Sequence, residues 1–494
     1  MKKVAISLLT SSLILATNGL AEDKVVKKRV LKGNMNLSYK IIPHDVDSFY
    51  NMFAQGMTYG RLRMNTFKWD WADNKAGKDN YAVGIGGSLV FKTGRLNGFS
   101  ATAGLYTSQN PFLTMDKENV GSLKAGKDTL SRNSAKDGNY GMAVLGESYI
   151  QYDFSKTTLK FGRQLFHSVF TKSNDTKMIP NSFDGLTLES KDIQDTKIQL
   201  AYFQAQKLRD HTDSHDVLTF NTKDGVKWDN NDDSAIHKGL SYSNFDKAGD
   251  STEHNLYIAT VKNESIDNLK AVVSYLTVPD VISNITLEAH YKINLYGWSL
   301  THGLRYMIQN DDGGGKIGGA SLKGKLANWK TGDDTRGYSN PNSLDSSLLA
   351  GRVVGQKGAF KILYGFSKIE DKADIVAPWR GFPTGGYTRA MAQYNWNANT
   401  SSQMIQASYN FGKAGIIDGF RSTIRYAIMD FDENKDDVVA DRSIIHVDFW
   451  KTFRSIPNFE TKIRIGVVDS ESGGVKNKTD TSYNEYRLEF NYLF

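Results

Sequence analysis

The sequence predicts an all-β fold: an antiparallel β-barrel that closes on itself and crosses a membrane. Three observations support this prediction. The chain begins with an export signal, continues as alternating strands joined by short and long connections in turn, and ends in an amphipathic aromatic strand. We count about eighteen alternating stretches, and a single-chain bacterial barrel has an even number of strands.

Residues 1–21 have the composition of a cleavable export signal. Met1-Lys2-Lys3 is a cationic start, no residue from Val4 to Thr17 is charged, and Ala21 completes a pair of small residues that a signal peptidase reads. The stretch of apolar or small residues from Val4 to Thr17 is shorter than the roughly 18 apolar residues of a membrane helix, which argues against a transmembrane anchor. We therefore expect cleavage after Ala21.

The composition of the whole chain fits a barrel that is wet inside and faces lipid outside. Its 494 residues include 24 Tyr, 25 Phe and 8 Trp, yet the mean hydropathy is only −0.45. A barrel strand exposes every second residue to lipid, so its average hydropathy stays low. The absence of cysteine excludes disulfides, thiolate metal sites and a cysteine nucleophile. The net charge of +7 is spread along the chain, without the basic cluster of a nucleic-acid-binding face.

The pattern divides the chain into three parts. Residues 1–21 form the signal peptide, residues 22–56 an N-terminal periplasmic segment, and residues 57–494 the transmembrane barrel. The N-terminal segment does not alternate, and Pro43 to Gln55 is predicted to be a short helix before the first strand. No Pro-rich or Ser-rich linker suggests a further domain.

The hairpin from Asn80 to Gln109 shows the repeating unit. Period two runs through both halves, and Thr93 to Asn97 turns the chain between them, which is the signature of a β-hairpin. Further short turns are expected near 155–157, 190–195, 263–268, 293–296, 356–358, 412–419 and 454–459. Long polar loops are expected near 107–141, 204–253, 308–345 and 368–399. Outer-membrane barrels have short periplasmic turns and longer external loops.

The last strand alternates most clearly. Its apolar positions are Tyr486, Leu488, Phe490, Tyr492 and Phe494, and its polar positions are Arg487, Glu489 and Asn491. The apolar parity is expected to face lipid and the polar parity the water in the lumen. The strand resembles the terminal strand of outer-membrane proteins, so outer-membrane lipid and the barrel-assembly machinery are the expected partners.

The alternation along each strand also predicts which side chains line the lumen. An Arg that faced lipid near the midplane would cost about 2–4 kcal/mol, so the charged positions are expected to face inward. The basic candidates are Arg61, Arg63, Arg305, Lys361, Arg421, Arg425, Lys462, Arg464 and Arg487. The acidic candidates are Glu147, Glu189, Glu288 and Glu489. A basic wall would favour anions or small carboxylates among small polar solutes. Alternatively, each Arg pairs with a carboxylate, and the wall then does not discriminate between solutes. The sequence leaves both possibilities open.

Residues 145–210 resemble the OprD-type porin family. The resemblance rests on Gly146-Glu147-Ser148-Tyr149, Gly162-Arg163-Gln164, Asp175 to Pro180 and Phe183-Asp184-Gly185, and extends weakly over the barrel, including Pro378 to Pro383. It implies a monomeric, eighteen-stranded barrel whose third loop folds inward, with basic residues that guide small carboxylates.

In this resemblance the constriction loop spans about Gln164 to Ser182, with Lys172, Asn174, Asp175 and Lys177 as polar contacts. Lys177 stands where the family pattern often has Arg. A lysine lacks the planar fork that holds a carboxylate at two points.

The sequence predicts no catalytic residue, metal site or cofactor. Gly319 to Lys325 lacks the Ser or Thr and the preceding strand of a phosphate-binding loop. The acidic runs Asp229–Asp233 and Asp430–Asp437 lack the spacing of a calcium loop, and the nine histidines form no metal motif. Two alternative classes are an outer-membrane enzyme built on a barrel and a soluble, secreted β-rich binding protein.

Overall fold

The computed structural model describes most of the chain after its N-terminus. The described residues are 27–29, 39–77, 79–110, 141–209, 211–218, 236–391, 393–436, 438–471 and 479–494. The predicted signal peptide, residues 1–21, and the acidic run Asp229–Asp233 lie outside these ranges.

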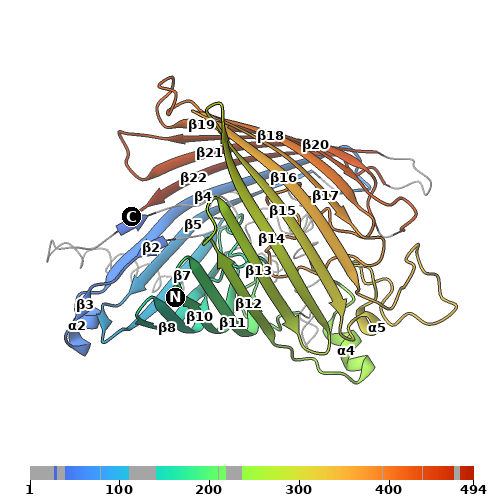
Figure 1. Cartoon of the computed structure of the whole chain (residues 1–494), viewed down its shortest axis with the longest axis horizontal. Helices are drawn as coiled ribbons and strands as arrows, with labels where there is room; N and C mark the ends of the chain where they lie inside the picture. The colour runs from blue at the N-terminus through green and yellow to red at the C-terminus, as the bar shows by residue number, and fades with distance from the viewer. Residues whose placement is uncertain are drawn as a thin grey trace.

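A wall of 18 antiparallel strands forms one closed barrel (Figure 1), which confirms the predicted fold class. The wall strands are β4 (Met57–Trp71), β5 (Asn80–Lys92), β7 (Phe99–Gln109), β8 (Met142–Phe154), β9 (Thr157–Gln164), β10 (Ser182–Ser190), β11 (Thr196–Lys207), β12 (Leu256–Asn263), β13 (Leu269–Val278), β14 (Ile282–Leu295), β15 (Trp298–Asp311), β16 (Ser346–Lys357), β17 (Phe360–Ile369), β18 (Ser401–Asn410), β19 (Phe420–Asp430), β20 (Arg442–Thr452), β21 (Phe459–Ser470) and β22 (Tyr483–Leu493).

The first and last wall strands close the barrel. β22 pairs antiparallel with β4, from Tyr483 opposite Trp71 to Leu493 opposite Arg61. Closure matters because lipid offers no hydrogen-bond partner to a free strand edge. Every wall strand is thus bonded on both sides.

Alternation along each strand separates a membrane-facing surface from the lumen. On β4, Leu62 is 60% exposed on the outside, whereas its neighbour Arg63 is 3% exposed and points inward. Leu105, Ile150 and Ile424 are exposed in the same way on other strands. The outer surface is therefore an apolar belt, and the polar side chains of the wall face the interior.

Aromatic rings form a girdle at the turn end of the barrel. Phe420 contacts Phe411 and Phe449 at ring distances of 5.1 and 6.1 Å, and Phe459 stacks on Phe490 at 6.1 Å. Farther round the wall, Phe99 stacks on Tyr152 at 4.4 Å, and Trp298 meets Phe360 edge to face at 6.2 Å. Such rings occupy the membrane–water interface, so this girdle marks the periplasmic edge of the bilayer.

Turn chemistry sets the short connections. Tyr296 and Gly297 join β14 to β15 with φ of 49° and 77°, as a two-residue hairpin with positive φ at both positions requires. The predicted turn at 293–296 was placed too early, because β14 continues to Leu295. The predicted loops at 204–253 and 308–345 likewise begin later, since β11 extends to Lys207 and β15 to Asp311.

The helix in the N-terminal segment is shorter than predicted. It contains a hairpin of β1 (Lys27–Arg29) and β2 (Tyr39–Ile41), then β3 (Asp45–Val46) and helix α2 (Phe49–Ala54). The helix predicted over 43–55 begins only after Ser48, whose side chain accepts a hydrogen bond from the backbone N–H of Asn51. β3 pairs in parallel with β6 (Arg95–Leu96) in the first periplasmic turn.

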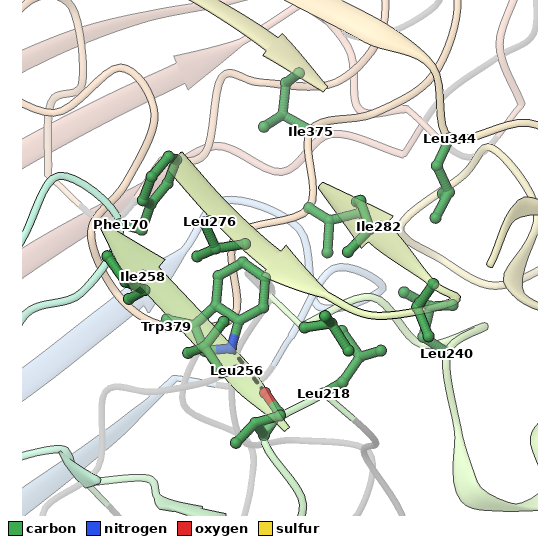
Figure 2. Close-up of a cluster of buried hydrophobic side chains, with 14 of the residues drawn as sticks. Phe170, Leu218, Leu240, Leu256, Ile258, Leu276, Ile282, Leu344, Ile375 and Trp379 are labelled. Carbon is green, nitrogen blue, oxygen red and sulfur yellow. Dashed lines mark hydrogen bonds between the residues drawn. The ribbon is translucent and has the colours of Figure 1, made fainter. Parts of the chain in front are cut away.

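An apolar core fills part of the lumen near the external end (Figure 2). Leu256, Leu276 and Ile282 point inward from β12, β13 and β14 and pack with Trp379 from an external loop. The indole N–H of Trp379 donates to the carbonyl of Val217 at 2.8 Å. Other external loops carry helices α4 (Tyr242–Ala248) and α5 (Gly315–Gly318). Among the described residues, no helix combines the length and apolarity needed to cross a bilayer.

The alternation predicts how a charge on the outer surface acts. Ile424→Arg should destabilise the barrel by about 2–4 kcal/mol, because the guanidinium would face lipid near the middle of β19. Denaturant unfolding in lipid vesicles measures this change. Ile416→Arg, in the exposed periplasmic turn before β19, is the matched control and should lie within about 0.5 kcal/mol of the parent. Equal effects of the two variants would contradict the assigned parity.

Candidate functional site

The loop between β9 and β10, residues 165–181 and here called L3, leaves the wall and crosses the lumen. Its tip is bound to the inner face of β4. The carboxylate of Asp175 accepts a hydrogen bond from Arg61 at 3.0 Å, with both side chains almost fully buried. Arg63 donates to the backbone carbonyls of Asp175, at 2.7 Å, and Lys177. Asn65 donates to the carbonyl of Thr176 at 2.9 Å. L3 is therefore fixed to the opposite wall by buried, charge-assisted bonds.

A second loop, residues 370–400 between β17 and β18 and here called L7, also folds inward and pairs with L3. The backbone N–H of Lys172 donates to the carbonyl of Trp379 at 3.2 Å, and that of Gly381 donates to Phe170 at 2.8 Å. A Cβ at position 381 would lie 2.2 Å from the backbone carbon of Phe170, so the approach of the two loops requires glycine there. L7 was predicted to be an external loop, and its inward contact with L3 was not predicted from the sequence.

Two arginines of the wall hold L7 in place. Arg305 on β15 donates to the carbonyl of Pro383 at 2.6 Å, and Arg352 on β16 donates to that of Gly386 at 2.7 Å. Both guanidinium groups also lie over the ring of Tyr387, at 4.8 and 4.9 Å from its centroid. Arg305 was a predicted lumen residue. Arg352 was missed, although it alternates with the outward-facing Gly351 and Val353.

Most of the predicted basic residues on β19 to β22 lie beside carboxylates. Asp448 lies 2.6 Å from Arg464, 3.3 Å from Arg425 and 3.8 Å from Lys462. Asp448 was not among the predicted acids, although Val447 and Phe449 on either side face outward. Its single charge is shared among three cations and His446, which lies 3.1 Å away.

The seam between β22 and β4 carries two more ion pairs. Glu489 binds Arg63 at 2.9 Å, and Glu485, a second acid missed in the sequence, binds Arg487. At the periplasmic end, Arg421 lies 3.6 Å from Glu460 and stacks on Trp450 at 4.8 Å.

The remaining predicted acids are also partnered. Glu147 accepts a hydrogen bond from the Tyr106 hydroxyl at 2.6 Å, Glu189 binds Lys197 at 2.7 Å, and Glu288 binds Arg305 at 2.9 Å. Lys361, the last predicted wall cation, lies exposed at the start of β17, on the lumen parity.

Of the four predicted contacts in L3, only Lys172 lines a cavity described below. Asn174 is buried and accepts a hydrogen bond from Arg209 at 2.9 Å, and Asp175 is engaged with Arg61. The side chain of Lys177 is fully buried. None of these three residues lines cavity A or cavity B.

L3 separates two cavities of similar size. The first, called cavity A, measures about 610 Å³ and lies between L3, L7 and strands β12 to β16. The second, called cavity B, measures about 600 Å³ and lies between L3, strands β4 to β11 and residues 41–42 of the N-terminal segment.

The charges around cavity A are unbalanced. Its lining contains the cations Lys172, Lys262, Lys270, Arg305 and Arg352, whereas Glu288 is its one carboxylate. Arg305 binds Glu288, and Lys270 binds Glu264 at 3.1 Å. Lys172, Lys262 and Arg352 have no carboxylate within 4 Å among the described residues. Cavity B is closer to balance, with Lys92, Lys160 and Lys197 beside Glu147 and Glu189.

The external loops are bonded to one another above these cavities. Asp374 of L7 accepts hydrogen bonds from the Tyr338 hydroxyl at 3.0 Å and from the backbone N–H of Leu322 at 2.9 Å, both in the loop before β16. In the loop between β19 and β20, called L8, Lys435 binds Asp432 at 3.0 Å and reaches Asp371 of L7 at 2.7 Å. The described residues contain no group of His, Asp and Glu side chains arranged to hold a metal ion.

The closed barrel, its apolar belt and its inward-folded loops define an outer-membrane porin. The family model for the outer membrane porin, OprD family, matches residues 117–492. The chain therefore belongs to the OprD family of outer-membrane porins, and its place is the outer membrane. No curated protein sequence matches the chain.

Solved porin structures share this fold at low sequence identity. OpdK of Pseudomonas aeruginosa, solved with vanillate, is 16% identical, with a TM-score of 0.65 over 90% of this chain and 99% of that one. OccAB1 of Acinetobacter baumannii is also 16% identical, with a TM-score of 0.68 over 90% of this chain and 97% of that one. OccK8 (OprE) of P. aeruginosa is 14% identical, with a TM-score of 0.65 over 90% and 99%.

The Arg61–Asp175 bond predicts the effect of a single substitution on L3. Asp175→Ala leaves a buried arginine without its carboxylate, which costs about 3–5 kcal/mol and should release the tip of L3 from β4. The chain has no cysteine, so Ser173→Cys, at a fully buried site in L3, provides one thiol to measure. Its reaction with a maleimide should accelerate strongly in Asp175→Ala. Asp184→Ala, which removes the partner of Arg163 between β9 and β10, should leave the rate unchanged; equal acceleration would count against the clamp.

The tether of L8 should depend on pH. Burial raises the pKa of Asp432, but hydrogen bonds from Asn399, Lys435 and the backbone N–H of Asn434 outweigh it and lower that pKa from 3.8 to about 2. A lowered carboxyl pKa stabilises the folded loop above pH 3.8, and this stability is lost as pH falls from 3.8 towards 2. Single-channel currents should therefore fluctuate more at pH 2 than at pH 5. Asp432→Asn should already fluctuate at pH 5; a quiet variant would exclude this tether.

Proposed function

We propose that this porin, a channel for small solutes, favours anions and small carboxylates, and that cavity A is where it selects them. The observation that carries this proposal is the excess of cations in the lining of cavity A, with Lys172, Lys262 and Arg352 free of carboxylates within 4 Å among the described residues. Fixed charge of one sign concentrates the opposite ion and speeds its entry.

The rest of the predicted basic wall contributes less to this preference. Arg63, Arg464 and Arg487 lie beside carboxylates, and a paired charge has a weaker field beyond its partner. The pairing alternative raised by the sequence thus applies to β19–β22 and β4, whereas the anion-attracting alternative applies to cavity A. L3 and L7 bring solutes close to these cations because both loops line the cavity.

One related protein supports the carboxylate class. The structure of OpdK contains vanillate, and vanillate is an aromatic carboxylate. A guanidinium such as that of Arg352 can bind a carboxylate at two points, and ammonium groups such as those of Lys172 and Lys262 act as point charges. Which carboxylate is carried depends on the shape of cavity A, which Phe382 and Val169 line beside the cations.

The family and fold favour a non-enzymatic channel over an enzyme built on a barrel. We further propose that the mature chain begins after Ala21, that the barrel works as a monomer, as the family resemblance implies, and that Phe494 marks the terminal strand for the barrel-assembly machinery.

The reversal potential of the channel in a planar bilayer tests the selectivity. Under a KCl gradient its sign should indicate anion preference, and the preference should weaken at high salt because screening shortens the reach of fixed charge. A clear preference for cations would overturn the proposal, and the absence of any conductance would overturn the channel itself.

Charge removal in cavity A tests the location. The double variant Lys172→Gln, Lys262→Gln should lose most of the anion preference while it keeps its conductance. Lys330→Gln removes a charge of the same sign from an exposed external loop and should change the reversal potential little. If both changes shift it equally, selection occurs at the external surface and not in cavity A.

A further inference from the structure

Helix α2 presents an aromatic face that the protein leaves uncovered. Phe49, Tyr50 and Phe53 are 69%, 78% and 52% exposed, whereas Met52 on the opposite side is buried. The rings of Phe49 and Phe53 touch each other edge to face, with centroids 5.2 Å apart. Monomeric proteins rarely expose such clusters without an interaction partner.

The helix is fixed to the periplasmic edge of the barrel. The carbonyl of Met52 accepts a hydrogen bond from the backbone N–H of Gly94, in the turn between β5 and β7, at 2.7 Å. Arg95 of the same turn binds Asp45, just before the helix, at 2.9 Å. α2 lies beyond the start of β4 at this end of the barrel (Figure 1). Its exposed face therefore has a defined position relative to the wall.

This position makes the aromatic face continuous with the membrane-facing girdle. A Cβ at Gly56, directly after the helix, would lie 2.4 Å from the ring of Phe91, which is on the outward parity of β5. At the end of the same periplasmic turn, Gly98 packs closely against the ring of Tyr152, and that ring stacks on Phe99. Helix, turn and girdle thus follow one edge of the apolar belt.

We propose that α2 is an interfacial anchor that inserts Phe49, Tyr50 and Phe53 into the periplasmic leaflet of the outer membrane. Aromatic side chains are favoured at that depth because their rings bury apolar area while the hydroxyl of Tyr50 remains near water. The six residues of the helix carry no charge, so insertion desolvates no ionised group.

The anchor would also hold a segment of the channel. Residues 41–46 lead directly into α2, and Ile41 and Ile42 line cavity B. Ile41 is buried in the same apolar cluster as Tyr59 and Val90 of the inner wall. With α2 in the membrane, this segment stays against the wall at the periplasmic side of cavity B.

Fluorescence quenching by brominated lipids tests the insertion. The chain has no cysteine, so Tyr50→Cys takes one environment-sensitive dye on the full-length protein in vesicles. We expect strong quenching by bromines placed near the headgroup and a blue-shifted emission. Leu105→Cys, on the membrane-facing wall, and Lys330→Cys, on an external loop, provide the embedded and the aqueous reference. Quenching of Tyr50→Cys no greater than that of Lys330→Cys would overturn the proposal.

A second variant tests the anchor without a dye on the helix. In Phe49→Ser, Phe53→Ser the apolar area is lost while Met52 still docks, so a thiol at Ile41→Cys, a site that is only 8% exposed, should react several-fold faster with a water-soluble maleimide. Ile456→Ser, which removes an exposed apolar side chain from another periplasmic turn, should not change that rate. An unchanged rate of thiol labelling in the double variant would contradict a lipid anchor. So would a dye at Tyr50→Cys that bound lipid does not quench but an added periplasmic protein shields.

Discussion

The constraint on which this structure depends is that a backbone in lipid must satisfy its hydrogen bonds within the protein. A sheet meets that constraint only by closing, and β22 closes it against β4. Closure fixes the parity of every wall strand, since a slip of one residue would turn Arg63 towards lipid and Leu62 towards water. The polar lumen and the apolar belt are both consequences of that one register.

The strands, in which apolar and polar residues alternate, could be predicted from the sequence. The parts of the fold that depend on contacts between distant residues could not. Alternation placed Arg305, Arg425 and Glu489 on the lumen side, where they lie. The same alternation also indicates Arg352 and Asp448, which were not among the predicted lumen residues. The inward path of L7 has no local signal, because it is set by its pairing with L3 and by arginines on β15 and β16.

The charges in the lumen fall into two groups. Buried cations beside carboxylates, as around Asp448, hold neighbouring strands and leave little field for a solute. The cations around cavity A include three without such neighbours among the described residues, and they surround a space that a small solute can enter. A count of basic residues along the strands cannot separate these two groups, because the difference lies in which loop or strand supplies the facing carboxylate.

Arg63 connects the seam of the barrel to L3, the loop that crosses the lumen. One guanidinium nitrogen binds Glu489 on the last strand, and the other binds the backbone of L3. All its partners are present only after β22 has paired with β4. We therefore expect a barrel that is still open between β22 and β4 to lack the carboxylate that holds Arg63 in place beneath L3, so that the loop across the lumen gains its full set of supports only when the circumference is complete.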